Sequence, residues 1–408
     1  MFAVCTKINK CSLDKYIQNG WGKARSNACI GGLKLPFPFI PPSITEDGVH
    51  KTLFYWDTYF TNIGLIADGH VDWARENVDN LLFALNMFGC VPNYTRLDGA
   101  KYCSQPPLLG LMIQDIYNQT KDDCWLEKAV YGLEKEYSFW MTKRITPIGL
   151  NSYGTNASDD DLLEYFEYIS TRVSVDKSLP VKEKIEIARN FVAEAESGED
   201  YTPRYQNHNA LEYVQIDLNS HLYGVEEFLS NYFECRDISK ATFYKESKQK
   251  RVELIERYCL NKETGIYCDY NFVKNTRNDV ISVACFMPYY YGFAKEECNI
   301  IAVYNALKTK GGVASCQDVG NYEYQWGYPN IWAPHQYFAY NALVKYGYEE
   351  QSEELRLNYV NLLSSVFERT GALWERYDEN GEAKDLEYPT QKMLGWTGGV
   401  YRFFTLIK

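Results

Sequence analysis

The sequence predicts a mainly α-helical protein. Apolar residues recur at helical spacing in several long segments, while alternating strand patterns are few and short. Long loops separate the helices, which favours helical hairpins arranged in a ring or stack with loops gathered at one end. No low-complexity linker divides the chain, so we expect one domain over residues 1–408, with 1–45 as an N-terminal strap packed on it.

Three amphipathic stripes give the clearest helices. Each stripe repeats apolar residues every three or four positions, which places them on one helix face. The stripes are Val71, Ala74, Val78, Leu81, Leu85 and Phe88; Leu218, Leu222, Val225, Leu229 and Tyr232; and Leu355, Tyr359, Leu362 and Val366. Further helices are predicted at 107–117, 122–143, 181–195, 240–259, 290–308 and 334–346. The expected loops are 31–58, 89–106, 144–160, 196–210, 310–333 and 371–396.

Charge and composition exclude several classes of function. The formal net charge of -12 argues against nucleic acid and anionic membranes, which require a basic surface. The first ten residues lack the apolar core of a secretory signal, so we expect a cytoplasmic protein, either a monomer or a small homo-oligomer. The 12 cysteines are scattered without paired spacing and are expected to be free, buried thiols.

No cofactor is expected from the motifs. The five histidines show no H-E-x-x-H pattern and no cluster with cysteines, so no catalytic metal is predicted, although loop carboxylates leave a calcium ion open. Nucleotide-binding glycine motifs and nucleophile elbows are also missing. The acidic run 159–161 with Glu164 is similar to a magnesium-diphosphate motif of terpenoid enzymes, but we favour a solvated helix start.

Five stretches combine carboxylates with aromatic rings. The chain contains 35 Tyr, 20 Phe and 9 Trp, more than a core of this size usually holds, so some rings are expected to line a site. Aromatic faces and carboxylates suit sugars, which have apolar faces and hydroxyl edges. Taken singly, each stretch could equally be a packed loop or a helix end. The stretches are 54–60, 196–204, 325–334, 373–378 and 387–397.

Together these stretches resemble, in order, the signatures of trehalases, inverting glycoside hydrolases that cleave the bond joining two glucose units. The resemblance covers roughly residues 45–400. The matching motifs are Tyr55-Trp56-Asp57-Thr58-Tyr59-Phe60, Pro92-Asn93, Ser104-Gln105-Pro106-Pro107, residues 196–204 with Asp200 and Arg204, Ile216-Asp217-Leu218-Asn219, residues 325–334, and the motifs beginning at Glu375, Glu387 and Gly395. The resemblance implies an all-α (α/α)6 toroid of six helical hairpins, with a sugar pocket at the loop end.

The resemblance also implies the residues of the site. Asp200 corresponds to the proton donor and Glu375 to the base that activates water. In an inverting mechanism such carboxyl groups lie about 6.5 to 9.5 Å apart. Asp200 must be protonated before it acts, and the neighbouring Glu196 and Glu199 could favour its protonated form. The implied substrate-binding residues are Tyr55, Trp56, Asp57, Asn93, Gln105, Gly198, Arg204, Trp326 and Glu387.

The sequence departs from the family pattern where arginines are usual. In the loop 46–51 only His50 or Lys51 could replace the usual arginine. Cys103 occupies the second arginine position, directly before the Ser-Gln-Pro-Pro motif. The third arginine is expected within residues 155–171, which contain none. Glu199 replaces the tryptophan usual before the acid. Pocket arginines bind substrate hydroxyls and carboxyl groups, so these changes indicate altered sugar recognition.

Two hypotheses about function therefore remain at this point. The first is a hydrolase of trehalose or a related α-glucoside, including an α-glucosidase of different linkage specificity. The second is a non-catalytic sugar-binding toroid, because the missing arginines could mark lost turnover. Retention of both Asp200 and Glu375 favours the hydrolase, and a small carbohydrate is the expected partner in either case.

Overall fold

Helices dominate the computed structural model, which describes residues 2–43, 51–295, 298–382, 385–386 and 388–407. In these residues there are fourteen α-helices. They are α1 (Phe2–Ala24), α2 (Tyr55–Ala67), α3 (Val71–Phe88), α4 (Leu109–Thr120), α5 (Asp123–Lys143), α6 (Asp159–Ile169), α7 (Val181–Glu196), α8 (Ile216–Phe233), α9 (Ile238–Tyr258), α10 (Met287–Tyr291), α11 (Ile300–Leu307), α12 (Ala333–Lys345), α13 (Glu349–Thr370) and α14 (Gly395–Leu406).

The described strands are all two residues long and pair only in small antiparallel ribbons. They are β1 (Tyr213–Val214), β2 (Leu260–Asn261), β3 (Ile266–Tyr267), β4 (Tyr270–Asn271), β5 (Thr276–Arg277), β6 (Lys308–Thr309), β7 (Gly312–Val313), β8 (Ile331–Trp332) and β9 (Arg376–Tyr377). The ribbons follow the orders β1-β4-β5, β2-β3, β6-β7 and β8-β9. They tie loops together and form no layer of their own.

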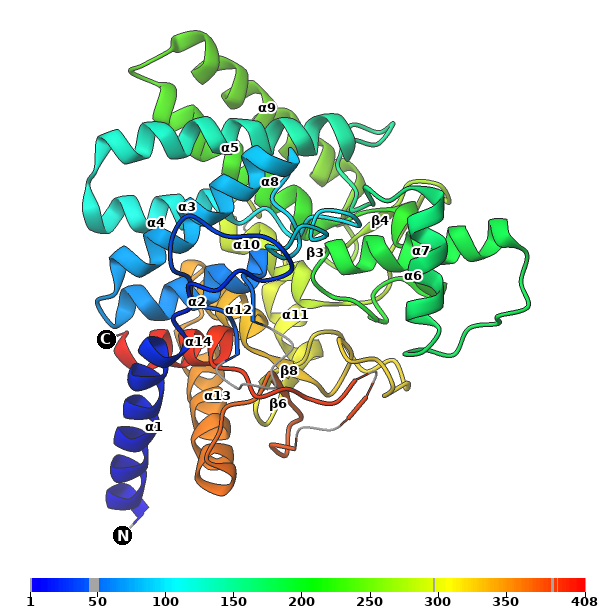
Figure 1. The fold of residues 1–408 in the computed structure, drawn as a ribbon. Coiled ribbons are helices and arrows are strands. Elements are labelled where there is room, and N and C mark those ends of the chain that lie inside the picture. Colours follow the sequence, from blue (N-terminus) through cyan, green and yellow to red (C-terminus); the bar gives the residue numbers. More distant parts are fainter. Residues whose placement is uncertain (1, 44–50, 296–297, 383–384, 387, 408) are drawn as a thin grey trace.

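Six helices form a closed inner ring. Following the contacts from one to the next, α2 packs on α4, α4 on α8, α8 on α10, α10 on α12, α12 on α14, and α14 returns to α2. The helices α3, α5, α9 and α13 each pack against the outside of this ring, α11 packs on the 3-10 turn 283–286 that leads into α10, and α1 packs on α13 (Figure 1). This is the (α/α)6 toroid that the sequence predicts.

The ring closes where α2 meets α14, and two glycines allow the close approach. A Cβ atom on Gly64 would lie 2.5 Å from the Cα atom of Gly399, and one on Gly399 would lie 2.0 Å from the carbonyl oxygen of Phe60. Neither position therefore tolerates a larger side chain without separating the helices. This seam joins the first and last helices of the ring.

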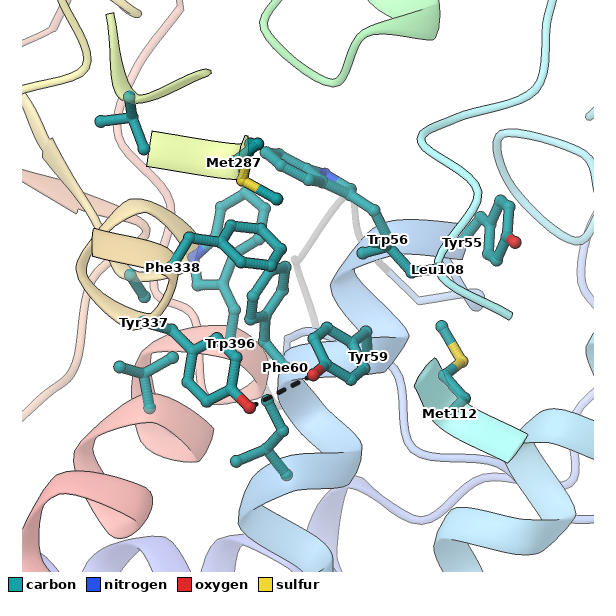
Figure 2. Packing of buried hydrophobic residues seen from close by; sticks show 14 of the residues in the cluster. Tyr55, Trp56, Tyr59, Phe60, Leu108, Met112, Met287, Tyr337, Phe338 and Trp396 are labelled. Atoms are coloured by element: carbon teal, nitrogen blue, oxygen red, sulfur yellow. Dashed lines mark hydrogen bonds between the residues drawn. The ribbon is translucent and has the colours of Figure 1, made fainter. Parts of the chain in front are cut away.

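Aromatic side chains fill the centre of the ring. Tyr59 and Phe60 of α2 contact Tyr337 and Phe338 of α12, with ring centroids between 5.4 and 6.5 Å apart. The hydroxyl groups of Tyr59 and Tyr337 are hydrogen-bonded at 3.2 Å, as Figure 2 shows. The abundant tyrosines therefore serve the core as well as the loop end, because a buried ring can bring its hydroxyl to a polar partner.

Helices α6 and α7 form a hairpin outside the ring, on the right of Figure 1. Two small apolar clusters hold it, one around Leu162, Phe166 and Val192 and one around Ile169 and Phe191. The hairpin thus has little contact with the main core. It packs beside the loop end, so its inner side can contribute to a site there.

The acidic run at the start of α6 is a helix cap. The Ser158 hydroxyl and the Asp161 backbone and side chain form a capping box. Lys101 pairs with Asp161 at 3.1 Å and with Glu164 at 2.6 Å, and Arg189 pairs with Asp159 at 2.8 Å. Among the described residues no group of three acidic, histidine or cysteine side chains could hold a metal ion. The solvated helix start fits these contacts, and the diphosphate motif does not.

Most predicted helices agree with the structure, but one is wrong. The segment 290–308 is split into α10 and α11, because Gly292 adopts φ 81° and ends α10 in a left-handed turn. The predicted loop at 31–58 overlaps the start of α2, and most of the expected strap 1–45 is the helix α1. Ten of the cysteines are described as free thiols, seven of them buried.

Candidate active site

A cavity of about 740 Å³ opens at the loop end of the ring. Trp56, Trp326 and Trp396 form one wall, with the Trp56 ring 5.7 Å from Trp326 and 5.9 Å from Trp396. Trp326 stacks on Trp332 at 3.7 Å, which fixes its plane. Other lining residues are Phe54, Asp57, Asn93, Tyr94, Arg96, Tyr102, Cys103, Gln105, Glu164, Tyr165, Tyr168, Arg172, Gly198, Asp200, Glu375, Tyr388 and Gln391.

Asp200 reaches the cavity from the loop that follows α7. Gly198 adopts φ 78° and lies against the Trp56 indole, where a Cβ atom would come within 2.8 Å of the ring. The glycine therefore lets the loop turn tightly over the tryptophan. The amide of Gln325 donates to the Asp200 carbonyl oxygen at 3.0 Å, and the Asp200 side chain is 34% exposed. A partly exposed carboxyl group can reach a ligand in the cavity.

The glutamates next to Asp200 bind cations of their own. The Arg144 guanidinium donates to Glu196 at 2.6 and 2.7 Å. Glu199 lies 3.0 Å from the His335 ring nitrogen and 3.4 Å from Arg204. The two glutamates thus make salt-bridged contacts of their own, and their influence on Asp200 stays a prediction.

Glu375 also lines the cavity, and its side chain is 2% exposed. The Tyr388 hydroxyl donates to its Oε1 atom at 2.8 Å, and Arg376 Nη1 lies 3.5 Å from Oε2. Its backbone carbonyl accepts from the Trp396 indole at 3.1 Å. Burial, followed by the charges of Glu375 and Asp200, raises the pKa of Tyr388 well above its usual value. Tyr388 therefore remains a hydrogen-bond donor to Glu375.

Pairing of β8 with β9 joins two of the sequence stretches. Ile331 pairs with Tyr377 and Trp332 with Arg376, so the loop before α12 and the loop after α13 lie side by side. Glu375 directly precedes β9, and Trp326 stacks on Trp332 at the end of β8. The β8–β9 pair thus positions both Glu375 and Trp326, which are distant in the sequence.

Most implied site residues line this one cavity. Asp57 follows Trp56 in the first turn of α2, and the side-chain oxygen of Gln105 accepts from the Trp56 backbone N–H at 3.1 Å. Asn93 donates to the Cys103 sulfur at 3.5 Å. With Gly198, Asp200, Trp326 and Glu375, these residues make a concave, aromatic and acidic site. Glu387 lies outside the described residues, as does most of the loop 46–51.

Two implied residues do not line the cavity. Arg204 is fully buried, donates to both oxygens of Asp269 at 2.7 and 2.9 Å, and also binds Asp217. Burial alone would lower the pKa of Arg204, but Asp217 and Asp269 raise it well above its usual value. The Tyr55 hydroxyl faces the core, where it accepts from the Leu109 N–H at 2.9 Å.

Tyr55 is expected to support stability. Its hydroxyl also donates to Glu136, a buried carboxyl group whose pKa burial raises to about 8. Tyr55→Phe removes both hydrogen bonds and leaves buried polar groups unpaired, so we expect the free energy of unfolding to fall by about 1–3 kcal/mol. Urea unfolding would measure the change, with Tyr131→Phe, whose ring is 63% exposed, as the control. Equal stability of both variants would contradict the role.

Among the lining residues that the sequence prediction missed, two contact Asp200 or Glu375. Arg172 follows α6 by three residues and lies 3.5 Å from Asp200, just beyond the segment 155–171 in which no arginine occurs. Tyr388 lies next to the predicted Glu387 and contacts Glu375. No local pattern marks Arg172, because it reaches the site only through the folding of the α6–α7 hairpin.

Comparison with known proteins shows which family the chain is similar to. A family model described as trehalase matches residues 33–407. The chain is 30% identical over 400 residues to the periplasmic trehalase of Shigella flexneri serotype 5b, covering 90% of this chain and 68% of that protein. The periplasmic trehalase of Escherichia coli K12 strain DH10B matches with the same identity and coverage.

Solved structures of similar fold agree with the toroid. The neutral trehalase of Saccharomyces cerevisiae superposes with a TM-score of 0.76 at 24% identity, covering 97% of this chain and 80% of that one. A GH63 mannosylglycerate hydrolase from Thermus thermophilus superposes with a TM-score of 0.62 at 16% identity, covering 96% and 100%. At these levels of sequence identity, the similarities show the fold alone.

The predicted cytoplasmic location is contradicted by these comparisons and is wrong. The two bacterial relatives at 30% identity are described as periplasmic. The prediction rested on ten residues at the start of the sequence and on no property of the folded domain. Within the described residues, no helix has the length and apolar character needed to cross a membrane.

Proposed function

Because the chain belongs to the trehalase family of glycoside hydrolases, we propose that it hydrolyses trehalose to two glucose molecules with inversion at the attacked carbon. The observation that carries this proposal is the cavity that both Asp200 and Glu375 line. Its volume of about 740 Å³ lies in the range of small-molecule sites. The three tryptophans offer apolar faces for sugar rings, and Asp57 offers a hydrogen-bond acceptor for hydroxyl groups.

In the proposed reaction Asp200 is the general acid. Its protonated carboxyl group gives a proton to the oxygen that bridges the two anomeric carbons, while the bond from that oxygen to one carbon breaks. The departing glucose therefore leaves as a neutral alcohol. Asp200 ends the step as a carboxylate. Its 34% exposure is consistent with regaining the proton from solvent once the products leave.

Glu375 is the proposed general base. It takes a proton from a water molecule whose oxygen forms a bond to the anomeric carbon on the face opposite the leaving group. The Tyr388 hydroxyl donates to its Oε1 atom and Arg376 Nη1 lies 3.5 Å from Oε2, so both groups orient the carboxyl group. One water is consumed, and the proton held by Glu375 afterwards returns to solvent.

Proton NMR of freshly mixed enzyme and trehalose tests the proposal. The glucose formed at the attacked carbon should appear as the β-anomer, while the leaving glucose keeps its α configuration. We therefore expect equal amounts of the two anomers before mutarotation sets in. Product that is only α would contradict inversion, and no product from trehalose or other α-glucosides would contradict hydrolysis. A sugar-induced rise in melting temperature without product would favour binding alone.

A further inference from the structure

Arg172 makes contacts through both its backbone and its guanidinium group. Its backbone N–H donates to the Ile169 carbonyl at 2.9 Å, in the turn that ends α6. Its guanidinium carbon lies 5.4 Å from the Tyr168 ring centroid and 5.0 Å from that of Tyr388. Nη1 donates to the Tyr168 hydroxyl at 2.7 Å, and Nη2 lies 3.5 Å from Asp200 Oδ2. A planar guanidinium that donates to one tyrosine hydroxyl and lies against the ring of a second tyrosine is strongly oriented.

Tyr388 connects this arginine to the other carboxyl group. Its ring contacts Arg172, while its hydroxyl donates to Glu375 Oε1 at 2.8 Å. Asp200 thus contacts Arg172, Arg172 contacts Tyr388, and Tyr388 contacts Glu375. All four residues line the cavity. Displacing the guanidinium would disturb Asp200 directly, whereas Glu375 keeps its Arg376 and backbone contacts.

Arg172 differs from the arginines that only stabilise the fold. Arg144, Arg204 and Arg251 are buried and make hydrogen bonds of about 2.7 Å to carboxylates outside the cavity lining. Arg172 lines the cavity, and its 3.5 Å separation from Asp200 exceeds the length of about 2.7–2.9 Å of a close charge-assisted hydrogen bond. The longer contact orients the carboxyl group and leaves it able to approach a ligand.

We propose that Arg172 is a positioning residue that sets the orientation of Asp200 toward the leaving sugar. This inference rests on the proposed function, because it assumes that Asp200 delivers a proton. The α6–α7 hairpin supplies the guanidinium from outside the ring, together with Tyr165 and Tyr168 on the same wall. The hairpin is therefore part of the site that binds the departing half of the substrate.

Two substrates separate positioning of the acid from a general loss of structure. Trehalose needs a proton on its leaving oxygen, whereas α-glucosyl fluoride releases fluoride without one. In Arg172→Gln we expect kcat for trehalose to fall about 100-fold, the size of effect that a small misplacement of a reacting group produces. For the fluoride we expect a loss of no more than about threefold, since general acid catalysis is not required.

Matched variants complete the experiment. Arg172→Lys keeps the charge but loses the planar group that lies against the Tyr388 ring, so its kcat for trehalose should fall between those of the wild type and Arg172→Gln. Arg189→Gln, which removes a half-buried arginine paired with Asp159 on the same hairpin and outside the cavity lining, should leave both activities unchanged. Melting temperatures of all variants would verify that each is folded.

The outcomes distinguish this inference from the proposed function. Equal losses on trehalose and fluoride in folded Arg172→Gln, or no loss on either, would overturn the positioning role while leaving the hydrolase intact. A raised KM for trehalose with unchanged kcat would also overturn it, because the residue would then bind sugar without orienting the acid. A wild-type protein that hydrolyses neither compound would refute the proposed function, and the inference would fail with it.

Discussion

Asp200→Asn is expected to lower kcat for trehalose by about a thousandfold, because the amide cannot give a proton to the leaving oxygen. The same variant should hydrolyse α-glucosyl fluoride at a rate within about tenfold of the wild type, since fluoride leaves without protonation. Because the Asp200 side chain is partly exposed, and its 3.5 Å contact with Arg172 is longer than a close hydrogen bond, the variant should fold normally. Steady-state kinetics with both substrates measure the contrast.

A matched control for this variant is available on the neighbouring hairpin. Asp160→Asn removes an exposed carboxylate from the first turn of α6 and should leave both rates unchanged. If Asp200→Asn kept its activity on trehalose, the general acid would lie elsewhere. If it lost both substrates equally, Asp200 would have a role other than proton donation.

Glu375→Gln is expected to remove activity on both substrates, by about ten-thousandfold in kcat. Whatever group leaves, a water molecule must lose a proton as it attacks the anomeric carbon, so a better leaving group cannot compensate for the missing base. Glutamine has the same shape and can still accept the hydrogen bond from Tyr388. The melting temperature should therefore change little.

The control for the second variant comes from the same loop. Glu382→Gln alters an exposed side chain seven positions further along and should be silent in both assays. Survival of fluoride hydrolysis in Glu375→Gln would contradict the base role. Both active-site variants should lose activity on trehalose, and only Asp200→Asn should keep it on α-glucosyl fluoride, which identifies acid and base without a structure of the complex.

The sequence predicted the helical class, and eight of the implied site residues line the cavity, while the errors have local physical causes. Tyr55 and Trp56 are adjacent in the same motif, but successive residues on a helix point about 100° apart, so only Trp56 faces the cavity. Arg204 was implied by its place in a motif, yet three carboxylates hold it in the core. A sequence motif marks a segment and does not specify which of its side chains contact a ligand.

Other features required the three-dimensional arrangement. The split of the predicted helix 290–308 depends on one left-handed glycine, Gly292, inside an otherwise apolar run. Arg172 has no neighbours in sequence that suggest chemistry, because Tyr388 and Asp200 join it only through tertiary packing. Residues whose role comes from distant partners carry no local signal in the sequence. The tryptophans and acids that lie within the family motifs do carry such a signal.

The seam between α2 and α14 also constrains when the enzyme can be assembled during synthesis. Trp56 and Trp396, which share a wall of the cavity, come from helices that lie more than 300 residues apart in the sequence and are therefore made at different times. Until α14 emerges from the ribosome, the nascent chain must keep the apolar flank of α2 uncovered, a state prone to aggregation. We therefore expect chaperone protection to matter until α14 has been made, and the cavity to be complete only once α14 has packed on α2.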